Sequence, residues 1–122
     1  MSIIANISAF LKVEGLSADL AFRKQFVTTA TPTAATHQRR TLGVADTAEA
    51  LDLGDVSTVE YIVIYADTNS IDIDCDFDSA FDADIEIPQG EVAMFKPAGT
   101  VYIKNHDAGQ APVYEYTVIG TT

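Results

Sequence analysis

Alternation of apolar and polar side chains dominates the chain and predicts β-strands rather than helices. Every second residue of the segment Ile3–Val13 is apolar, and Gly15 ends the run. The next segment, Leu16–Thr29, fits either a returning strand or a short helix, and its β-favouring residues, such as Phe22 and Phe26, favour the strand. The N-terminal part is therefore predicted to form two successive strands.

A threonine- and alanine-rich stretch follows these two strands. Residues 28–37 offer little to bury, and Pro32 cannot donate a ladder hydrogen bond, so an extended loop or arm is predicted there. Gln38–Val44 and Glu49–Leu53 are predicted as short strands, with a turn at Gly54 and Asp55.

The two strongest strand patterns lie in the second half of the chain. Val59–Tyr65 is almost continuously apolar, which indicates a central strand with both faces covered, and Tyr114–Ile119 repeats its Glu-Tyr-x-Val-Ile pattern. Shorter candidate strands lie between them, at Ile71–Phe77, Ala83–Ile87, Glu91–Lys96 and Val101–Lys104. Eight to ten short strands without a convincing long helix predict an all-β sandwich or barrel. With 122 residues, the chain fits one domain, 1–122.

The predicted hairpin of residues 71–87 is unusually acidic. If its strands alternate strictly, all seven of its acidic side chains point away from the core. An EF-hand calcium loop does not match, because Phe77 stands at the glycine position and Ala83 at that of the bidentate glutamate. We expect a solvated face that opposes edge pairing, and no cofactor. The weak candidates for a metal site are Asp72, Asp74, Asp76, Asp82 and Asp84.

Charge divides the chain unevenly. The net charge is −11, yet residues 1–45 carry five cations and two acids, whereas residues 46–122 carry two cations and sixteen acids. Such acidity argues against nucleic acid as a partner. The basic third is expected to dock on an acidic neighbour, such as another copy, through Arg23, Lys24, Arg39 and Arg40. No apolar run is long enough for a membrane-spanning helix, and the N-terminus lacks the pattern of a signal peptide, so assembly in a cytoplasm is expected.

Candidate chemistry is sparse. His37 and His106 lie in separate polar segments. Cys75 occupies one of the alternate, apolar positions of its strand, so we predict that its side chain is a small buried one rather than a nucleophile. One cysteine cannot form an intrachain disulfide, and no nucleotide-binding or serine-hydrolase motif occurs in the sequence. We therefore predict no catalytic residue and no enzymatic activity.

The middle and end of the chain resemble small virion proteins of tailed bacteriophages. The resemblance covers residues 47–119: a Thr-Ala-Glu-Ala strand and a Gly54-Asp55-Val56 turn lead into Tyr61–Ile64, and Pro88–Glu91 leads toward the closing Glu115–Ile119 strand. The aspartate-rich hairpin and the extra Gln89 depart from the family pattern. The resemblance implies a jelly-roll-like antiparallel β-sandwich that decorates or cements a capsid, typically as a trimer.

The resemblance therefore implies a capsid decoration protein that binds the outer surface of a major-capsid lattice, and the predicted fold class and lack of catalytic residues agree with it. The expected docking or subunit-exchange element is the segment Leu16–Arg40, which carries the cations and the threonine-rich stretch. Two alternatives are a neck or tail component of a virion, and a calcium- or glycan-binding β-sandwich whose acidic loops and tyrosines contact the ligand.

Overall fold

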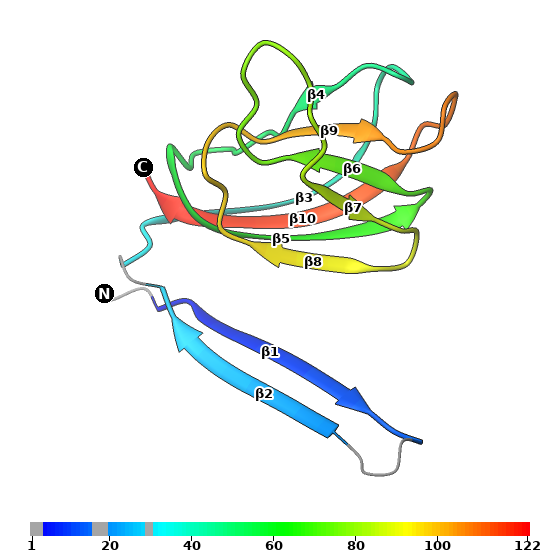
Figure 1. Cartoon of the computed structure of the whole chain (residues 1–122). Coiled ribbons are helices and arrows are strands. Elements are labelled where there is room, and N and C mark those ends of the chain that lie inside the picture. The colour runs from blue at the N-terminus through cyan, green and yellow to red at the C-terminus, as the bar shows by residue number, and fades with distance from the viewer. Residues whose placement is uncertain (1–3, 16–19, 29–30) are drawn as a thin grey trace.

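The computed structural model describes residues 4–15, 20–28 and 31–122, which form ten β-strands and no helix (Figure 1). The strands are β1 (Asn6–Val13), β2 (Leu20–Val27), β3 (Ala34–Thr41), β4 (Glu49–Ala50), β5 (Thr58–Thr68), β6 (Ile71–Asp74), β7 (Ile85–Ile87), β8 (Val92–Phe95), β9 (Tyr102–Asn105) and β10 (Val113–Thr121). Within these described ranges there is no helix that could cross a membrane.

Strands β3 to β10 form an antiparallel sandwich, which confirms the predicted fold class. One sheet has the order β3-β10-β5-β8 and the other the order β4-β9-β6-β7. The pairs are nested: β3 pairs with β10, β4 with β9, β5 with β8 and β6 with β7. This part of the chain is therefore one long antiparallel ribbon that doubles back between β6 and β7, with successive pairs in alternate sheets.

The core lies between the two sheets and follows from the alternation in the sequence. Each strand turns every second side chain inward, where removal of apolar surface from water stabilises the fold by about 1.5–3 kcal/mol for each large side chain. The central members are at most 2% exposed and come from both sheets: Ile62, Ile64, Ala66, Ile71, Ile73, Ile103, Tyr114, Tyr116 and Val118.

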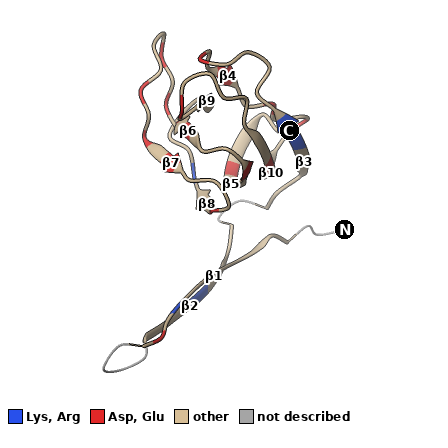
Figure 2. Cartoon of the chain, turned by 90° about the vertical axis from the view of Figure 1, so that its right-hand side faces the viewer, with Lys and Arg blue, Asp and Glu red and all other residues tan. Residues whose placement is uncertain are grey.

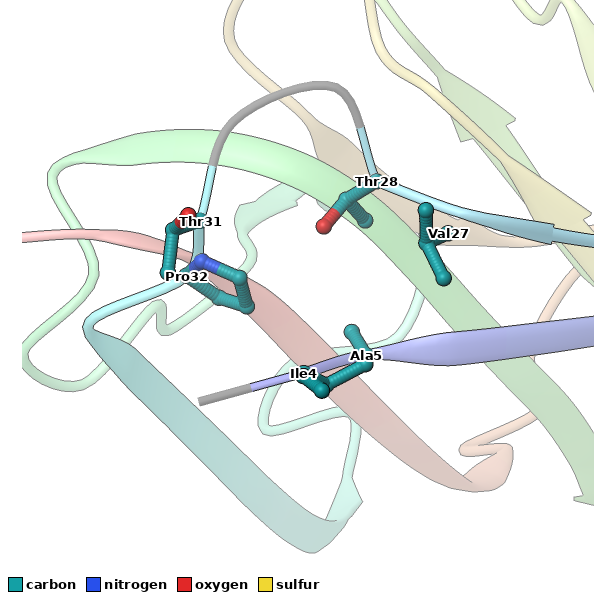
Figure 3. Close-up of a pocket in the computed structure, with 6 residues that line it drawn as sticks. All are labelled: Ile4, Ala5, Val27, Thr28, Thr31 and Pro32. Carbon is teal, nitrogen blue, oxygen red and sulfur yellow. The ribbon is translucent and has the colours of Figure 1, made fainter. Parts of the chain in front are cut away.

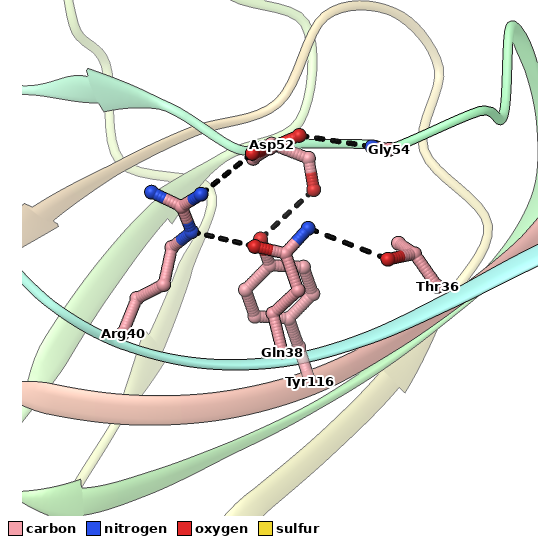
Figure 4. A network of polar contacts seen from close by, with 6 residues as sticks. All are labelled: Thr36, Gln38, Arg40, Asp52, Gly54 and Tyr116. Atoms are coloured by element: carbon pink, nitrogen blue, oxygen red, sulfur yellow. Dashed lines mark hydrogen bonds and ion pairs between the residues drawn. The ribbon is translucent and has the colours of Figure 1, made fainter.

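A polar network ties strand β3 to the loop that follows β4 (Figure 4). The Tyr116 hydroxyl donates to the Asp52 carbonyl at 2.8 Å, and Arg40 Nη2 lies 2.6 Å from Asp52 Oδ2. Arg40 Nε also donates to Gln38 Oε1 at 2.7 Å. The backbone amide of Gly54 and, to a smaller extent, Arg40 lower the pKa of Asp52. The network links the two layers where β3 forms a sheet edge.

Strand β3 begins earlier than its sequence predicts. Residues 34–37, expected in an extended loop or arm, belong to this strand, which ends at Thr41 rather than Val44. The reason is its neighbour: β10 pairs with β3 along its whole length, from Ala34 opposite Gly120 to Thr41 opposite Val113. Ladder pairing in a sheet outweighs the low intrinsic strand preference of these residues.

Strands β1 and β2 pair only with each other and belong to neither sheet of the sandwich. Of the predicted segment Leu16–Thr29, the strand Leu20–Val27 is confirmed, while residues 16–19 and 29 lie outside the described part. The first two strands thus form a separate hairpin rather than part of the expected sandwich, and in Figure 1 it extends away beneath β8 and β5.

Candidate docking site on the N-terminal arm

The β1–β2 hairpin, called the arm below (described residues 4–15 and 20–28), has one apolar face and one mixed face. Residues directly opposite each other in an antiparallel pair point to the same side. The apolar face consists of Ile7, Ala9, Leu11 and Val13 opposite Phe26, Lys24, Phe22 and Leu20. The mixed face consists of Asn6, Ser8, Phe10 and Lys12 opposite Val27, Gln25, Arg23 and Ala21.

The root of the apolar face packs on the outer face of the β3-β10-β5-β8 sheet. Ile7 is only 7% exposed, and the Phe26 ring lies 5.3 Å from the Tyr61 ring, centroid to centroid. Beside this contact, the β1 segment and the side of β5 and β8 with Val63 and Val92 line an open groove of about 470 Å³. The sandwich therefore covers only the beginning of the apolar face.

The distal part of the same face is uncovered in the single chain. Leu11 is 62% exposed, Leu20 59% and Phe22 54%, and all eight residues of β2 are exposed. Figures 1 and 2 both show the far end of the arm clear of the sandwich. A lone two-stranded hairpin is marginally stable in water, and a contiguous exposed apolar surface marks an interaction site. The arm is therefore the candidate docking site.

The mixed face also presents large side chains to solvent. Phe10 is 61% exposed and Val27 58%, and the Arg23 guanidinium carbon lies 5.4 Å from the centre of the Phe10 ring. At this distance the cation and the ring attract each other, which fixes an aromatic and a positive charge side by side. This face can therefore contact a partner that offers both apolar and acidic groups.

A small pocket lies where the arm joins the sandwich. It has a volume of about 210 Å³, and Figure 3 shows Pro32 on one side, Val27 and Thr28 across from it, and Ile4 and Ala5 below. Its lining is mostly apolar, and Pro32 is buried. The pocket belongs to the joint between the two parts of the chain.

The four cations predicted to dock a partner are not brought together. Lys24 lies on the apolar face of the arm and Arg23 on its mixed face. Arg39 and Arg40 lie on the sandwich, where they form ion pairs with Asp67 and Asp52. The hydrogen bond and the charge of Asp67 raise the pKa of Arg39. Of these four cations, only Arg23 and Lys24 therefore belong to the candidate site.

The acidic loop between β6 and β7 departs from the predicted outward alternation, because Asp74 is 1% exposed. Asp74 Oδ1 accepts from the Asp76 amide at 3.1 Å and Oδ2 from the Asp82 amide at 2.9 Å. The Asp82 amide hydrogen bond is the main cause that lowers the pKa of Asp74, whereas the side-chain hydrogen bond with Asp74 raises that of Asp76. The buried carboxylate thus holds the loop that covers it.

Three of the five weak metal candidates lie together. Asp74, Asp76 and Asp84 each offer a carboxylate oxygen within 4.8 Å of the others. Asp82 contributes its backbone amide to Asp74, and Asp72 is engaged elsewhere, by a histidine. Asp84 Oδ2 accepts from the Cys75 amide at 2.8 Å, so it also fixes the loop. The observed contacts give the cluster a structural role.

Cys75 and the two histidines lie in separate places. Burial, with a smaller effect of the neighbouring aspartates, raises the pKa of the Cys75 thiol to about 11, so the thiol is protonated at neutral pH. His37 lies on the outer face of the sandwich, 2.9 Å from Glu115. His106 lies between Asp72 at 2.9 Å and Glu86 at 3.3 Å, and the Asp72 contact raises its pKa.

Among the exposed apolar residues of the candidate site, Leu20 and Phe22 lie within the segment Leu16–Arg40 that the sequence predicts for docking, whereas Leu11 lies outside it. Leu11 and Phe22 carry the same alternation as core strands, so their exposure has no distinct sequence signal. Comparisons of the chain with protein-family models, curated proteins and solved structures found no match.

Proposed function

We propose that the chain is a non-enzymatic structural component of a virion that decorates the outer surface of an assembled capsid. The observation that best supports this proposal is the arm, whose far end exposes apolar side chains on both faces. A protein that reinforces a lattice works through buried interface area rather than through a reaction, and such an arm supplies that area.

The nested strand order supports the proposal as well. Eight strands wound as β3-β10-β5-β8 over β4-β9-β6-β7 fit the jelly-roll-like sandwich that the resemblance of residues 47–119 implies. The same resemblance is the ground for a virus setting, with a neck or tail position as the alternative within that setting.

The mixed face of the arm is the proposed capsid contact. It places Phe10, Arg23 and Lys12 on one side of the arm, where all three are exposed and a neighbouring protein can reach them. Aromatic and arginine side chains are enriched at interface hot spots. A contact that uses these cations weakens with salt, because exposed charges are screened.

Co-sedimentation with capsids of the virus that encodes the chain tests the proposal. The wild-type chain is expected to pellet with capsids in a saturable and salt-sensitive manner, and Phe10→Ser and Arg23→Glu are expected to reduce the bound fraction. Val44→Ser is the matched control, since Val44 is 60% exposed but lies in the loop between β3 and β4. A wild-type chain that stays in the supernatant at low salt would contradict the proposal.

A further inference from the structure

We infer that the apolar face of the arm is an exchange element, which inserts into the groove beside β5 and β8 of a second copy of this chain. The first argument is that the apolar face continues beyond the part that its own sandwich covers. This face already packs by its root against its own sheet, through Ile7 and the Phe26–Tyr61 contact. The distal residues Leu11 and Phe22 lie on that same face beyond the contact.

The receiving surface shows complementary chemistry. Val63 and Val92 on the outer face of the sheet are 38% and 61% exposed, and with Met94 they line the groove of about 470 Å³ beside the arm. Apolar side chains are therefore exposed both in the groove and at the far end of the arm. Filling it with side chains from another arm removes both surfaces from water.

Charge favours a second copy over an unrelated partner. Residues 1–28 carry three cations and two acids, a net charge of +1, whereas residues 29–122 carry four cations and sixteen acids, a net charge of −12. Figure 2 shows that most of the acidic segments lie on the sandwich and that one lies on the arm. The arm of one copy is therefore drawn to the sandwich of another, while two sandwiches repel each other.

The size of the surface also fits a stable assembly. The arm has sixteen strand residues, and each copy would contribute both an arm and a receiving sheet. A standard interface uses about 20–30 residues on each side, which reciprocal exchange supplies. Reciprocal exchange between two copies also closes the assembly, because each copy receives the arm of the same copy to which it gives its own.

Light scattering coupled to size exclusion tests the inference on the full chain without capsids. The wild-type protein is expected to have at least twice the mass of one 13.1 kDa chain. Leu11→Ser combined with Phe22→Ser is expected to weaken self-association by about a hundredfold or more, since each buried large apolar side chain contributes about a tenfold change or more. Val44→Ser is the matched control: Val44 is 60% exposed, about as much as Leu11, but it lies in the loop between β3 and β4, outside the arm and the groove.

Mixing two variants tests the exchange itself. Val92→Lys impairs the groove and repels the cationic arm, while the Leu11→Ser, Phe22→Ser double variant impairs the arm. Each alone is expected to be monomeric, and the mixture is expected to associate, because one intact arm then meets one intact groove. Circular dichroism and melting temperature report whether both variants are folded, and both replace exposed side chains.

The outcomes separate this inference from the proposed function. A monomeric wild type, an assembly that survives the double variant, or an equal loss with Val44→Ser would overturn the exchange. A monomer that still pellets with capsids through the arm would leave the decoration proposal standing with the capsid as the occupant of the apolar face. An oligomer that ignores capsids would leave the exchange standing and remove the decoration proposal.

Discussion

Two neighbouring residues of β5 provide a quantitative test of the sandwich. Ile64 points into the core and is 1% exposed, whereas Val63 points to the outer face and is 38% exposed. Ile64→Ala removes three buried carbons, a loss of about 2.4 kcal/mol at about 0.8 kcal/mol for each. The cavity in a central strand raises the total to about 3–4 kcal/mol, because strands paired on both sides relax little.

Val63→Ala is the matched substitution and removes two carbons that are little more than half buried. Its expected cost is about 1 kcal/mol, without a cavity term. With a urea dependence of about 1.5 kcal/mol per molar, Ile64→Ala lowers the unfolding midpoint by about 2–2.7 M and Val63→Ala by about 0.7 M. Far-UV circular dichroism suits the measurement, because the chain has no tryptophan.

The unfolding experiment is best performed in the background with Leu11→Ser and Phe22→Ser, so that self-association does not add to the measured stability. Equal costs for the two alanine variants, or a larger cost for Val63→Ala, would refute the assignment of faces on β5. A changed slope in urea would instead indicate a different extent of structure in one of the two states.

Two further predictions concern packing and pH. Gly120→Ala is expected to lower the free energy of unfolding by at least about 3 kcal/mol, because the added Cβ would lie 1.9 Å from the Thr58 carbonyl oxygen on the paired strand. Gly109→Ala is the comparison, because a Cβ there meets nothing within 4 Å and only the positive φ of Gly109 opposes the substitution. It is expected to cost about 1 kcal/mol in the same thermal or urea unfolding. His106 has a raised pKa in the folded state, so its contribution to stability is complete below the unfolded pKa of about 6.5 and is lost as the pH rises through the folded pKa. The stability gap between wild type and His106→Asn is therefore expected to be larger in urea unfolding at pH 5.5 than at pH 8.5, and a gap that grows with pH would show that the sign is wrong.

Strict alternation predicts strands well where neighbours inside the same chain cover one face. Ile71 and Ile73 are fully buried, as their parity requires. Asp74 has the outward parity of the same strand and is nevertheless buried, because the loop that follows folds over it and donates two backbone amides to its carboxylate. Whether a loop buries a side chain depends on the path of the chain after the strand. The alternation of apolar and polar residues within the strand gives no information on that path.

The start of β3 shows a second limit of sequence-based prediction. Residues 34–37 have few apolar side chains and follow a proline, so their composition favours a loop. They form a strand because β10, a much stronger strand, offers a free edge to pair with. Local composition describes only one of the two strands that pair. Which strand it pairs with is determined by the fold as a whole.

The arm extends this argument to function. The regular alternation of its first strand and the β-favouring residues of its second correctly predict two strands. The alternation predicts that the apolar face is buried, but it does not indicate whether the same chain or a partner molecule covers that face. Ile7 is covered by the chain's own sandwich, and Leu11, four residues later on the same face, is 62% exposed. The point where intramolecular cover ends on a continuous apolar face is therefore the place where a partner is expected to begin, and here it lies between those two residues.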